Sequence, residues 1–335
     1  ENALVIEEYE CLTSVKALEL VYYAGEHAAE VRKKVYGNEV YIEGLIEIVN
    51  SCLGDSCYCG IRRSNINRER YALTKEQILS CCNEGYKWGI RTFVLQSDDG
   101  TLPADEVCDI VSDIRRSFPD CAVTLSLGEY THREYEQMYH AGTDRYILRR
   151  EAADKCHFAK MHPKGRFFDN RMSCLRDLRD IGFQTGYCFT VGGPYQTSHT
   201  LAENLKFIEE FQPDICTVEP FFSHKDSPSV SFRPESLLQM IYTLSLIRLV
   251  RPSILLFVSA AFGCIAEDGR ERGIKAGANV VAVNLSPISV HDKYGLHDSK
   301  TDRGEIKQEL EQLRILTERI GYRTVFDGGE VKRLS

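Results

Sequence analysis

Short apolar runs alternate with amphipathic stretches over most of the chain. Runs rich in β-branched and aromatic residues mark eight candidate strands, at 43–50, 91–97, 121–127, 144–149, 185–191, 214–221, 253–258 and 279–283. Because most of these runs are apolar throughout, the pattern predicts parallel strands that are covered on both faces. Residues 1–37 carry apolar positions at helical spacing and predict a helical segment that ends near Gly37.

Helix-start signals follow several of the candidate strands. Three sequences fit a capping box, namely Thr74-x-x-Gln77, Thr131-x-x-Glu134 and Thr200-x-x-Glu203. Glycines suited to the ends of helices precede four of the strands, namely Gly89, Gly142, Gly182 and Gly277. Eight strands that alternate with helices predict a (β/α)8 TIM-type barrel in the α/β class, and a doubly wound open sheet is the alternative.

No linker or low-complexity segment interrupts this alternation. We therefore expect one barrel domain over 38–325, an N-terminal helical extension over 1–37 and a C-terminal tail over 326–335. The chain has 41 Lys and Arg against 49 Asp and Glu, for a formal net charge of −8. The chain therefore lacks the excess of positive charge that is typical of a general nucleic-acid-binding protein. No apolar run approaches the roughly 18 residues of a membrane span, and no signal peptide is expected.

The cysteine content changes this picture. Thirteen cysteines in 335 residues are an odd number in a chain too long for a disulfide scaffold, so we expect a reducing cytoplasm. Most of them stand in apolar runs, where cysteine behaves as a small buried hydrophobe. Only Cys52, Cys57 and Cys59 form a tight cluster, directly after the first candidate strand. Barrel enzymes place their chemistry at the carboxyl ends of the strands, which is where this cluster falls.

Residues 50–63 carry a family resemblance. The segment resembles the cluster loop of radical S-adenosylmethionine (SAM) enzymes, whose pattern is Cys-x3-Cys-x2-Cys after the first barrel strand. Further stretches resemble the HydE-type [FeFe]-hydrogenase maturases, relatives of biotin synthase and methylornithine synthase, at 94–97, 123–129, 141–151, 277–281 and 284–287. The resemblance implies a [4Fe–4S] cluster held by three thiolates, with SAM on the remaining iron.

The loop departs from the family pattern at one ligand. Cys52 and Cys59 match the first and third cysteines, but Ser56 stands at the second position and Cys57 follows it. Three interpretations remain open. Cys57 supplies the second thiolate after a one-residue shift, which Gly54 would permit; the cluster assembles poorly, because a serine hydroxyl is a hard ligand beside soft thiolates; or the barrel is silent and these cysteines are free thiols.

The resemblance also implies a set of SAM-binding residues, consisting of Asp99, Ser126, Glu151, Arg171, Gly192 and Tyr294. Arg171 matches an arginine that pairs with the SAM carboxylate, a role that suits a planar guanidinium. Glu151 matches a contact to the nucleoside end. Asp98 and Asp99 stand where the family has Gly-Glu, so Asp99 keeps a shorter carboxylate and Asp98 adds a side chain. The structural alternatives are a solvated helix arginine and a packing tyrosine.

A small anionic substrate is expected deeper in the barrel, near Gln96, Arg149, Ser259 and Arg270. Arg149 and Glu151 are two residues apart on one strand, so both side chains should face the barrel mouth, and an internal ion pair is the alternative. Ser259-Ala260 replaces a Thr-Thr pair of the family and removes one hydroxyl. For Arg270 the alternative, which residue type favours, is a position on a surface helix.

Three functions follow from these observations. The first is a radical SAM enzyme of [FeFe]-hydrogenase H-cluster maturation that cleaves SAM to a 5′-deoxyadenosyl radical and acts on an iron–cysteine complex bearing carbonyl and cyanide. Its partners would be a tyrosine-cleaving radical SAM maturase, a scaffold GTPase and an electron donor such as a ferredoxin or flavodoxin. The second is a related enzyme acting on a small amino acid, like methylornithine synthase. The third is a SAM- or metabolite-binding barrel without a cluster.

Overall fold

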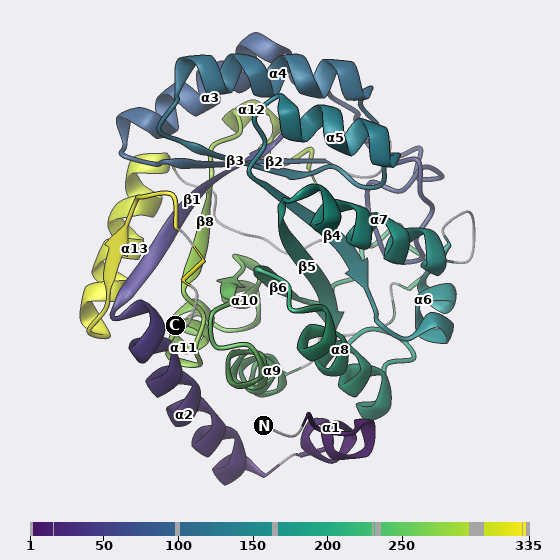
Figure 1. Ribbon diagram of the computed structural model, residues 1–335, viewed down its shortest axis with the longest axis vertical. Helices are drawn as coiled ribbons and strands as arrows, with labels where there is room; N and C mark the ends of the chain where they lie inside the picture. Colours follow the sequence, from purple (N-terminus) through teal and green to yellow (C-terminus); the bar gives the residue numbers. More distant parts are fainter. Residues whose placement is uncertain are drawn as a thin grey trace.

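Eight parallel strands close into a barrel, as the sequence predicts (Figure 1). The computed structural model describes residues 3–15, 17–97, 101–162, 167–229, 231, 236–294, 305–329 and 331–332. The barrel strands are β1 (Glu39–Glu47), β2 (Thr92–Gln96), β3 (Ala122–Ser126), β4 (Arg145–Glu151), β5 (Gln184–Val191), β6 (Ile215–Pro220), β7 (Leu255–Val258) and β8 (Val280–Asn284). Each strand pairs with the next, β8 pairs with β1, and the β1–β2 pairing closes the ring.

The beginning of the barrel differs from the sequence prediction in two respects. β1 starts at Glu39, four residues before the predicted 43–50 run, because the chain enters the strand directly from the turn at Gly37. A further strand, β9 (Arg323–Val325), pairs with β1 over Glu39–Tyr41, ahead of the segment that pairs with β2. Three residues of mixed polarity carry no apolar run, so the periodicity did not reveal β9.

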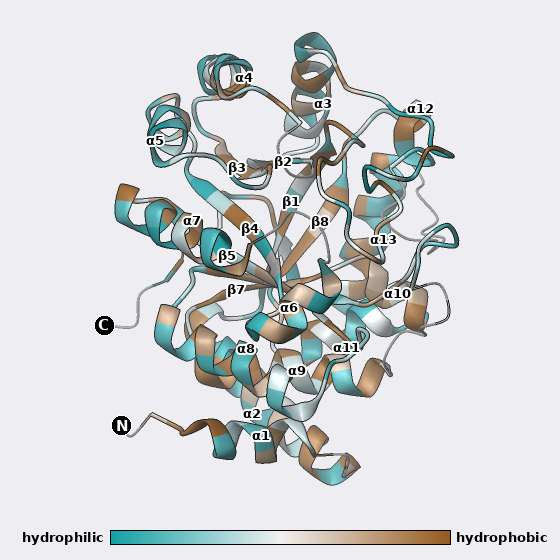
Figure 2. Cartoon of the chain, turned by 90° about the vertical axis from the view of Figure 1, so that its right-hand side faces the viewer, coloured by the Kyte–Doolittle hydropathy of each residue, from teal (hydrophilic) through white to brown (hydrophobic). Residues whose placement is uncertain are grey.

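The helices of the described residues mostly surround the strands as an outer layer (Figure 1). They are α1 (Ile6–Thr13), α2 (Leu18–Tyr36), α3 (Lys75–Lys87), α4 (Ala104–Ser117), α5 (His132–His140), α6 (Lys155–Met161), α7 (Phe168–Ile181), α8 (Ser198–Phe211), α9 (Leu237–Val250), α10 (Ala261–Ile265), α11 (Gly269–Lys275), α12 (Ile288–His291) and α13 (Ile306–Arg319). The outer helices are mostly striped by hydropathy, whereas the strands are largely apolar (Figure 2). Both N-terminal helices lie on the outside of the barrel, α1 against α8 and α2 against α9.

The structure confirms two of the three predicted helix starts. Thr74 and Thr131 cap α3 and α5, and each accepts a hydrogen bond from the backbone N–H three residues on. The prediction at Thr200 is wrong, because α8 begins one turn earlier: Thr197 is the cap and accepts from the Thr200 N–H. The glycines before the strands adopt the positive φ expected of helix ends, as at Gly89 with φ 91°.

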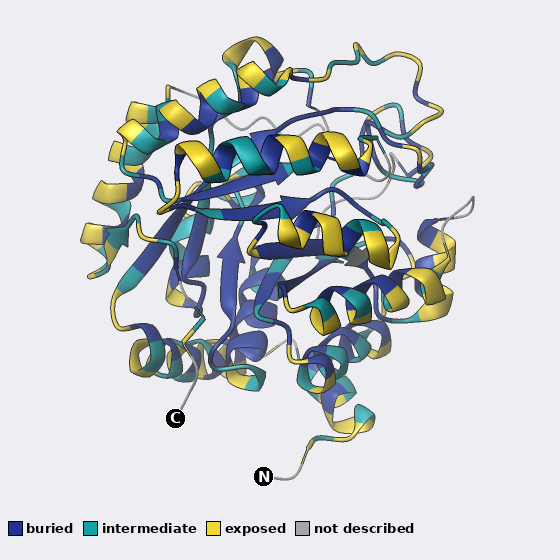
Figure 3. Cartoon of the chain, turned by 45° about the horizontal axis from the view of Figure 1, so that its top comes forward, coloured by how far each residue is buried: buried dark blue, intermediate teal, exposed yellow. Residues whose placement is uncertain are grey.

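Alternating strand residues divide the core into two layers. Outward residues such as Phe93 and Leu125 pack beneath the helices, whereas Tyr41, Ile147 and Leu255 belong to a separate cluster inside the barrel. The strands are therefore buried on both sides, while the helices expose their outer faces (Figure 3). This arrangement explains why most strand runs are apolar and most helices are amphipathic. The helix α9, which α2 covers, is buried over most of its length.

A buried ion pair seals the amino end of the barrel. Arg145 Nη1 of β4 lies 3.0 Å from Glu43 Oε1 of β1, and both side chains are only 3% exposed. The same guanidinium donates to the Gly328 carbonyl and, at 2.5 Å, to the Gly329 carbonyl. The segment after β9 thus closes this end of the barrel, which leaves the opposite end for a site.

Among the described residues, no helix is long and apolar enough to cross a membrane.

Candidate functional site

Polar side chains replace apolar ones at the carboxyl end of the barrel interior. Strand alternation turns these residues inward: Glu47, Gln96, Ser126, Arg149, Thr190, Glu219, Ser259 and Asn284. Most of them stay partly accessible, although the residues that surround them on the strands are buried. The mouth of the barrel is therefore lined by polar groups, in the place where barrel enzymes hold their substrates.

The cysteine loop follows β1 and is fixed by two side chains. Arg70 donates to the carbonyls of Asn50 at 2.7 Å, Ile61 at 2.8 Å, Arg62 at 2.8 Å and Asn65 at 3.0 Å. Asn50 is fully buried, and its side chain accepts from the Tyr71 N–H and donates to the Lys293 carbonyl. One guanidinium therefore holds the start and the end of the loop together.

Cys52 and Cys59 lie together at the base of this loop. Both side chains are buried in one small cluster with Ile61 and Tyr294. The Tyr294 hydroxyl accepts a 3.2 Å hydrogen bond from Gln96 Nε2 at the end of β2. The fold thus brings together four residues that the sequence marked for the cluster, SAM and the substrate.

Cys57 is held differently from the other two cysteines. Its N–H donates to the Met161 carbonyl and its carbonyl accepts from the Ser229 N–H, both at 3.1 Å. Burial raises the pKa of the Cys57 thiol, and a hydrogen bond with Ser229 acts in the opposite direction. A one-residue shift that carried Cys57 to the ligand position would break both main-chain hydrogen bonds.

Glu151 reaches the mouth of the barrel by an unexpected route. The β4–β5 pairing shifts between Arg149 and Glu151, so that these residues face Cys188 and Phe189, which are consecutive. The prediction that simple alternation points Arg149 and Glu151 the same way is therefore wrong, because a bulge interrupts it. Glu151 has a left-handed φ of 63°, and its Oε2 lies 2.7 Å from His162 Nε2. A strained non-glycine residue of this kind is typical of functional sites.

Arg171 lies on α7 and is 1% exposed. Its Nε lies 2.5 Å from Glu129 Oε1 after β3, and its Nη1 donates to the Arg149 carbonyl. A solvated helix arginine is thus excluded. Asn170 also donates to the second oxygen of Glu129, which fixes that carboxylate from two sides.

The remaining predicted residues divide into two groups. Ser126 is buried at the end of β3, and Gly192 follows β5 with φ 86° and its N–H bonded to Gln196. Arg270 instead lies in the helical layer, where it pairs with Glu309 of α13 at 3.3 Å. The structure therefore does not bring Arg270 to the other residues. Asp99 lies outside the described residues.

Ser259 faces the carboxyl group of Glu219. The sequence did not lead to Glu219 as a site residue, although it did lead to Ser259. Burial raises the pKa of Glu219, while the Ser259 hydroxyl and the Arg149 guanidinium act against that shift. Glu219 falls in the candidate strand 214–221, so the same strand-end rule that selected Gln96 would have found it. Glu129 directly follows the strand end at Ser126 and lies in the stretch 123–129 that carries the resemblance. His162 and Arg70 carried no such signal, because they lie on a helix end and a loop.

Comparisons with known proteins identify the family to which the chain belongs. The radical SAM superfamily matches residues 46–208. The chain is 36% identical over 274 residues to the [FeFe] hydrogenase maturase subunit HydE of Thermotoga maritima, covering 82% of this chain and 78% of the relative. It is 25% identical to the 3-methylornithine synthase of Methanosarcina barkeri, covering 91% and 86%.

Solved structures give the same fold. The crystal structure of methylornithine synthase (PylB) superimposes with a TM-score of 0.81 at 21% identity, covering 97% of this chain and 95% of that one. The maturase HydG superimposes with a TM-score of 0.82 at 20% identity, covering 97% and 73%. The barrel and its loop therefore define a radical SAM protein. Within that class, the chain belongs to the HydE family of [FeFe]-hydrogenase maturases.

Enzymes of this family use a [4Fe–4S] cluster and SAM. The donor set of the loop does not match a three-thiolate cluster site. Cys52 and Cys59 lie together, but Ser56 stands at the second position and Cys57 is tied to Ser229. Within the described part of the chain, no three His, Cys, Asp or Glu side chains gather as a metal-binding group. Two thiols and a hydroxyl are present where three thiolates are expected.

Proposed function

We propose that the protein is a HydE-type radical SAM enzyme that acts on a small iron–cysteine complex in the mouth of its barrel. The observation that carries this proposal is the joining of the cysteine loop to the barrel mouth through Gln96 and Tyr294. Family membership supports the same activity.

The residues of this chain can bind, orient and shield such a substrate. Glu151 and Arg171 stand at the rim, where a SAM molecule would find a carboxylate and a guanidinium. The buried His162 positions Glu151, and Glu129 positions Arg171. Arg149 and Ser259 lie deeper and offer charge and a hydroxyl to an anionic group. The closed amino end keeps water from entering behind the substrate.

The proposal also includes a cellular compartment and partner proteins. None of the thirteen cysteines, all of which the structure describes, forms a disulfide, which supports a reducing cytoplasm. The partners would be a tyrosine-cleaving radical SAM maturase, a scaffold GTPase and a ferredoxin or flavodoxin as electron donor.

Anaerobic reconstitution with iron and sulfide, followed by SAM and dithionite, tests this function. The expected result is 5′-deoxyadenosine, together with an active [FeFe]-hydrogenase when the other maturases are supplied. SAM binding with neither product would overturn the enzymatic role.

Two features of the loop support the alternative, in which the protein binds SAM but forms neither product. The loss of one ligand at Ser56 and the tethering of Cys57 favour a barrel that binds SAM or a metabolite without a cluster. Calorimetric SAM binding that is independent of iron would identify this function.

A further inference from the structure

Asn204 is a polar residue on the inner face of α8, where the helical periodicity favours an apolar side chain. Its neighbours on that face, Leu201, Leu205 and Ile208, belong to the apolar core between the helix and the barrel, and Asn204 itself is 0% exposed. A buried amide costs free energy unless its donors and acceptors are satisfied. The reason for a polar residue at this position therefore lies in what its amide contacts.

The Asn204 amide contacts the chain just beyond the end of β4. Its Oδ1 accepts a 2.9 Å hydrogen bond from the Ala153 N–H and a second one from the Tyr187 hydroxyl of β5. Its Nδ2 donates to the Thr200 carbonyl at 2.8 Å, so the amide cannot turn over without losing these bonds. The helix thus holds a main-chain N–H that lies two residues after Glu151.

Glu151 depends on such support because its backbone is strained. It has a φ of 63° and lies at the bulge in the β4–β5 pairing. The neighbouring strand holds the residue itself, since Glu151 pairs in register with Phe189 and its carbonyl accepts a 3.4 Å hydrogen bond from the Thr190 hydroxyl. The bond between Ala153 and Asn204 adds a contact from the helical layer, which fixes the direction in which the chain leaves the strand.

That direction also decides where the partner of Glu151 lies. Asp154 follows Ala153 and caps α6, and it accepts a 2.6 Å hydrogen bond from the His157 N–H. His162 follows the end of α6, and its Nε2 lies 2.7 Å from Glu151 Oε2. A displacement at Ala153 would therefore move both the backbone of Glu151 and the imidazole that its carboxylate contacts.

We propose that Asn204 is a positioning residue for SAM binding, which acts through Ala153 to hold the Glu151 carboxylate toward the nucleoside end of SAM. The inference rests on the proposed function and deepens it, because the contact between Glu151 and SAM is itself implied by the family resemblance. It adds a residue of the helical layer to the site, and it gives the reason for a buried amide on the mostly apolar inner face of α8.

The ring signals of His162 test the positional part of the proposal without any ligand. Nuclear magnetic resonance of the iron-free full chain with labelled histidine observes them, and their loss in His162→Phe assigns them. Asn204→Ala leaves the Ala153 N–H without its acceptor, so the His162 signals should shift.

Asn279→Ala is the matched control for this experiment. Asn279 is also 0% exposed and also accepts a 2.9 Å hydrogen bond from a strand N–H, that of Leu256, but it lies at the amino end of the barrel. The substitution should lower the melting temperature, as Asn204→Ala does, because both leave a buried N–H without a partner. It should leave the His162 signals and the affinity for SAM unchanged.

A double-mutant cycle on SAM affinity tests the functional part. Calorimetry on the iron-free full chain should show about tenfold weaker SAM binding in Asn204→Ala, the effect of one misplaced hydrogen-bonding partner. In a Glu151→Gln background the same substitution should weaken binding less than about twofold, because the carboxylate through which Asn204 acts has already been removed. A merely structural role would weaken binding by the same factor in both backgrounds.

The inference and the proposed function can fail separately. Unmoved His162 signals in Asn204→Ala, equal factors in the two backgrounds, or no SAM binding by the unsubstituted chain would overturn the inference, even when hydrogenase maturation succeeds. If the signals move and the cycle is non-additive but no deoxyadenosine forms, the positioning role of Asn204 stands and the radical function falls.

Discussion

His162 Nε2 lies 2.7 Å from Glu151 Oε2, and the histidine side chain is 1% exposed. The contact joins the loop after α6 to the bulge that ends β4. Glu151 has a left-handed backbone, which a strand residue other than glycine does not normally adopt. The contact with the histidine holds the Glu151 carboxylate in place in that conformation.

Replacing His162 with phenylalanine should separate this contact from packing. The variant keeps a ring beside Phe158, whose centroid lies 4.5 Å away, but it removes the polar partner of Glu151. We expect about tenfold weaker SAM binding and a loss of about 2 kcal/mol in the free energy of unfolding. Calorimetry and urea unfolding measure the two effects. His140→Phe, at an exposed site, should change neither.

The identity of the second cluster ligand can be decided by a pair of substitutions. Ser56→Cys restores the family spacing, so it should raise the iron and sulfide bound per chain after anaerobic reconstitution. Cys57→Ser should leave that content unchanged, because Cys57 is anchored toward Ser229. Loss of iron in Cys57→Ser alone would show that the loop shifts and that Cys57 is the ligand.

Arg70→Lys should loosen the cysteine loop without unfolding the barrel. Lysine cannot reproduce the fork that reaches four main-chain carbonyls. We expect faster amide hydrogen exchange over 50–65 and reduced iron uptake. Arg63→Lys provides the comparison, since Arg63 is exposed on the same loop. Equal exchange in the two variants would contradict the role of Arg70.

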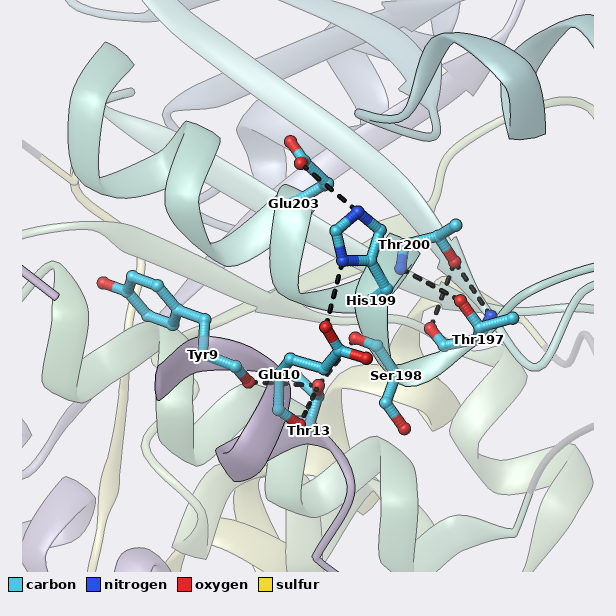
Figure 4. A network of polar contacts seen from close by, with 8 residues as sticks. All are labelled: Tyr9, Glu10, Thr13, Thr197, Ser198, His199, Thr200 and Glu203. Carbon is cyan, nitrogen blue, oxygen red and sulfur yellow. Dashed lines mark hydrogen bonds and ion pairs between the residues drawn. The ribbon is translucent and has the colours of Figure 1, made fainter. Parts of the chain in front are cut away.

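The contact between α1 and α8 should depend on pH (Figure 4). His199 Nδ1 lies 3.1 Å from Glu10, and Nε2 lies 3.7 Å from Glu203. The hydrogen bond with Glu10 raises the pKa of His199, and Glu203 and Asp154 act in the same direction. The stabilisation is therefore complete below the unfolded pKa and is lost as the pH rises through the raised folded value.

Hydrogen exchange over α1 measures this effect. Exchange, corrected for its intrinsic rate, should increase from pH 6 to pH 9, while the Thr13 hydroxyl keeps its 2.7 Å bond to the Ser198 carbonyl and prevents complete release. His199→Gln should remove the pH dependence. An unchanged profile in that variant would assign the effect to another group.

Arg145→Met should be strongly destabilising, because it leaves Glu43 buried without its cation. Burial already raises the pKa of Glu43, and among the described residues Arg145 is the group that opposes that shift. We expect a loss of about 3 kcal/mol or more in the free energy of unfolding, measured by denaturant titration. Arg91→Met removes a surface pair with Asp120 and should cost less than about 1 kcal/mol. Equal losses would argue against a dominant role for the buried pair.

Much of the fold was predictable because its signals are local. Most of the parallel strands are apolar because both of their faces are buried, and the caps at Thr74 and Thr131 lie next to the helices they begin. The site was only partly predictable. Gln96 and Arg149 end recognisable strands, whereas His162 and Glu129 act from segments whose position depends on the whole chain.

The sequence by itself determined the barrel, the family and the altered ligand at Ser56, because each rests on residue type, spacing or periodicity. Tertiary structure decided what spacing cannot express. It tied Cys57 to Ser229 through contacts more than a hundred residues apart, and it turned Glu151 by a bulge that breaks the alternation of β4. It also brought Ser259 and Arg149 to the carboxyl group of Glu219, which depends on where the strand ends meet.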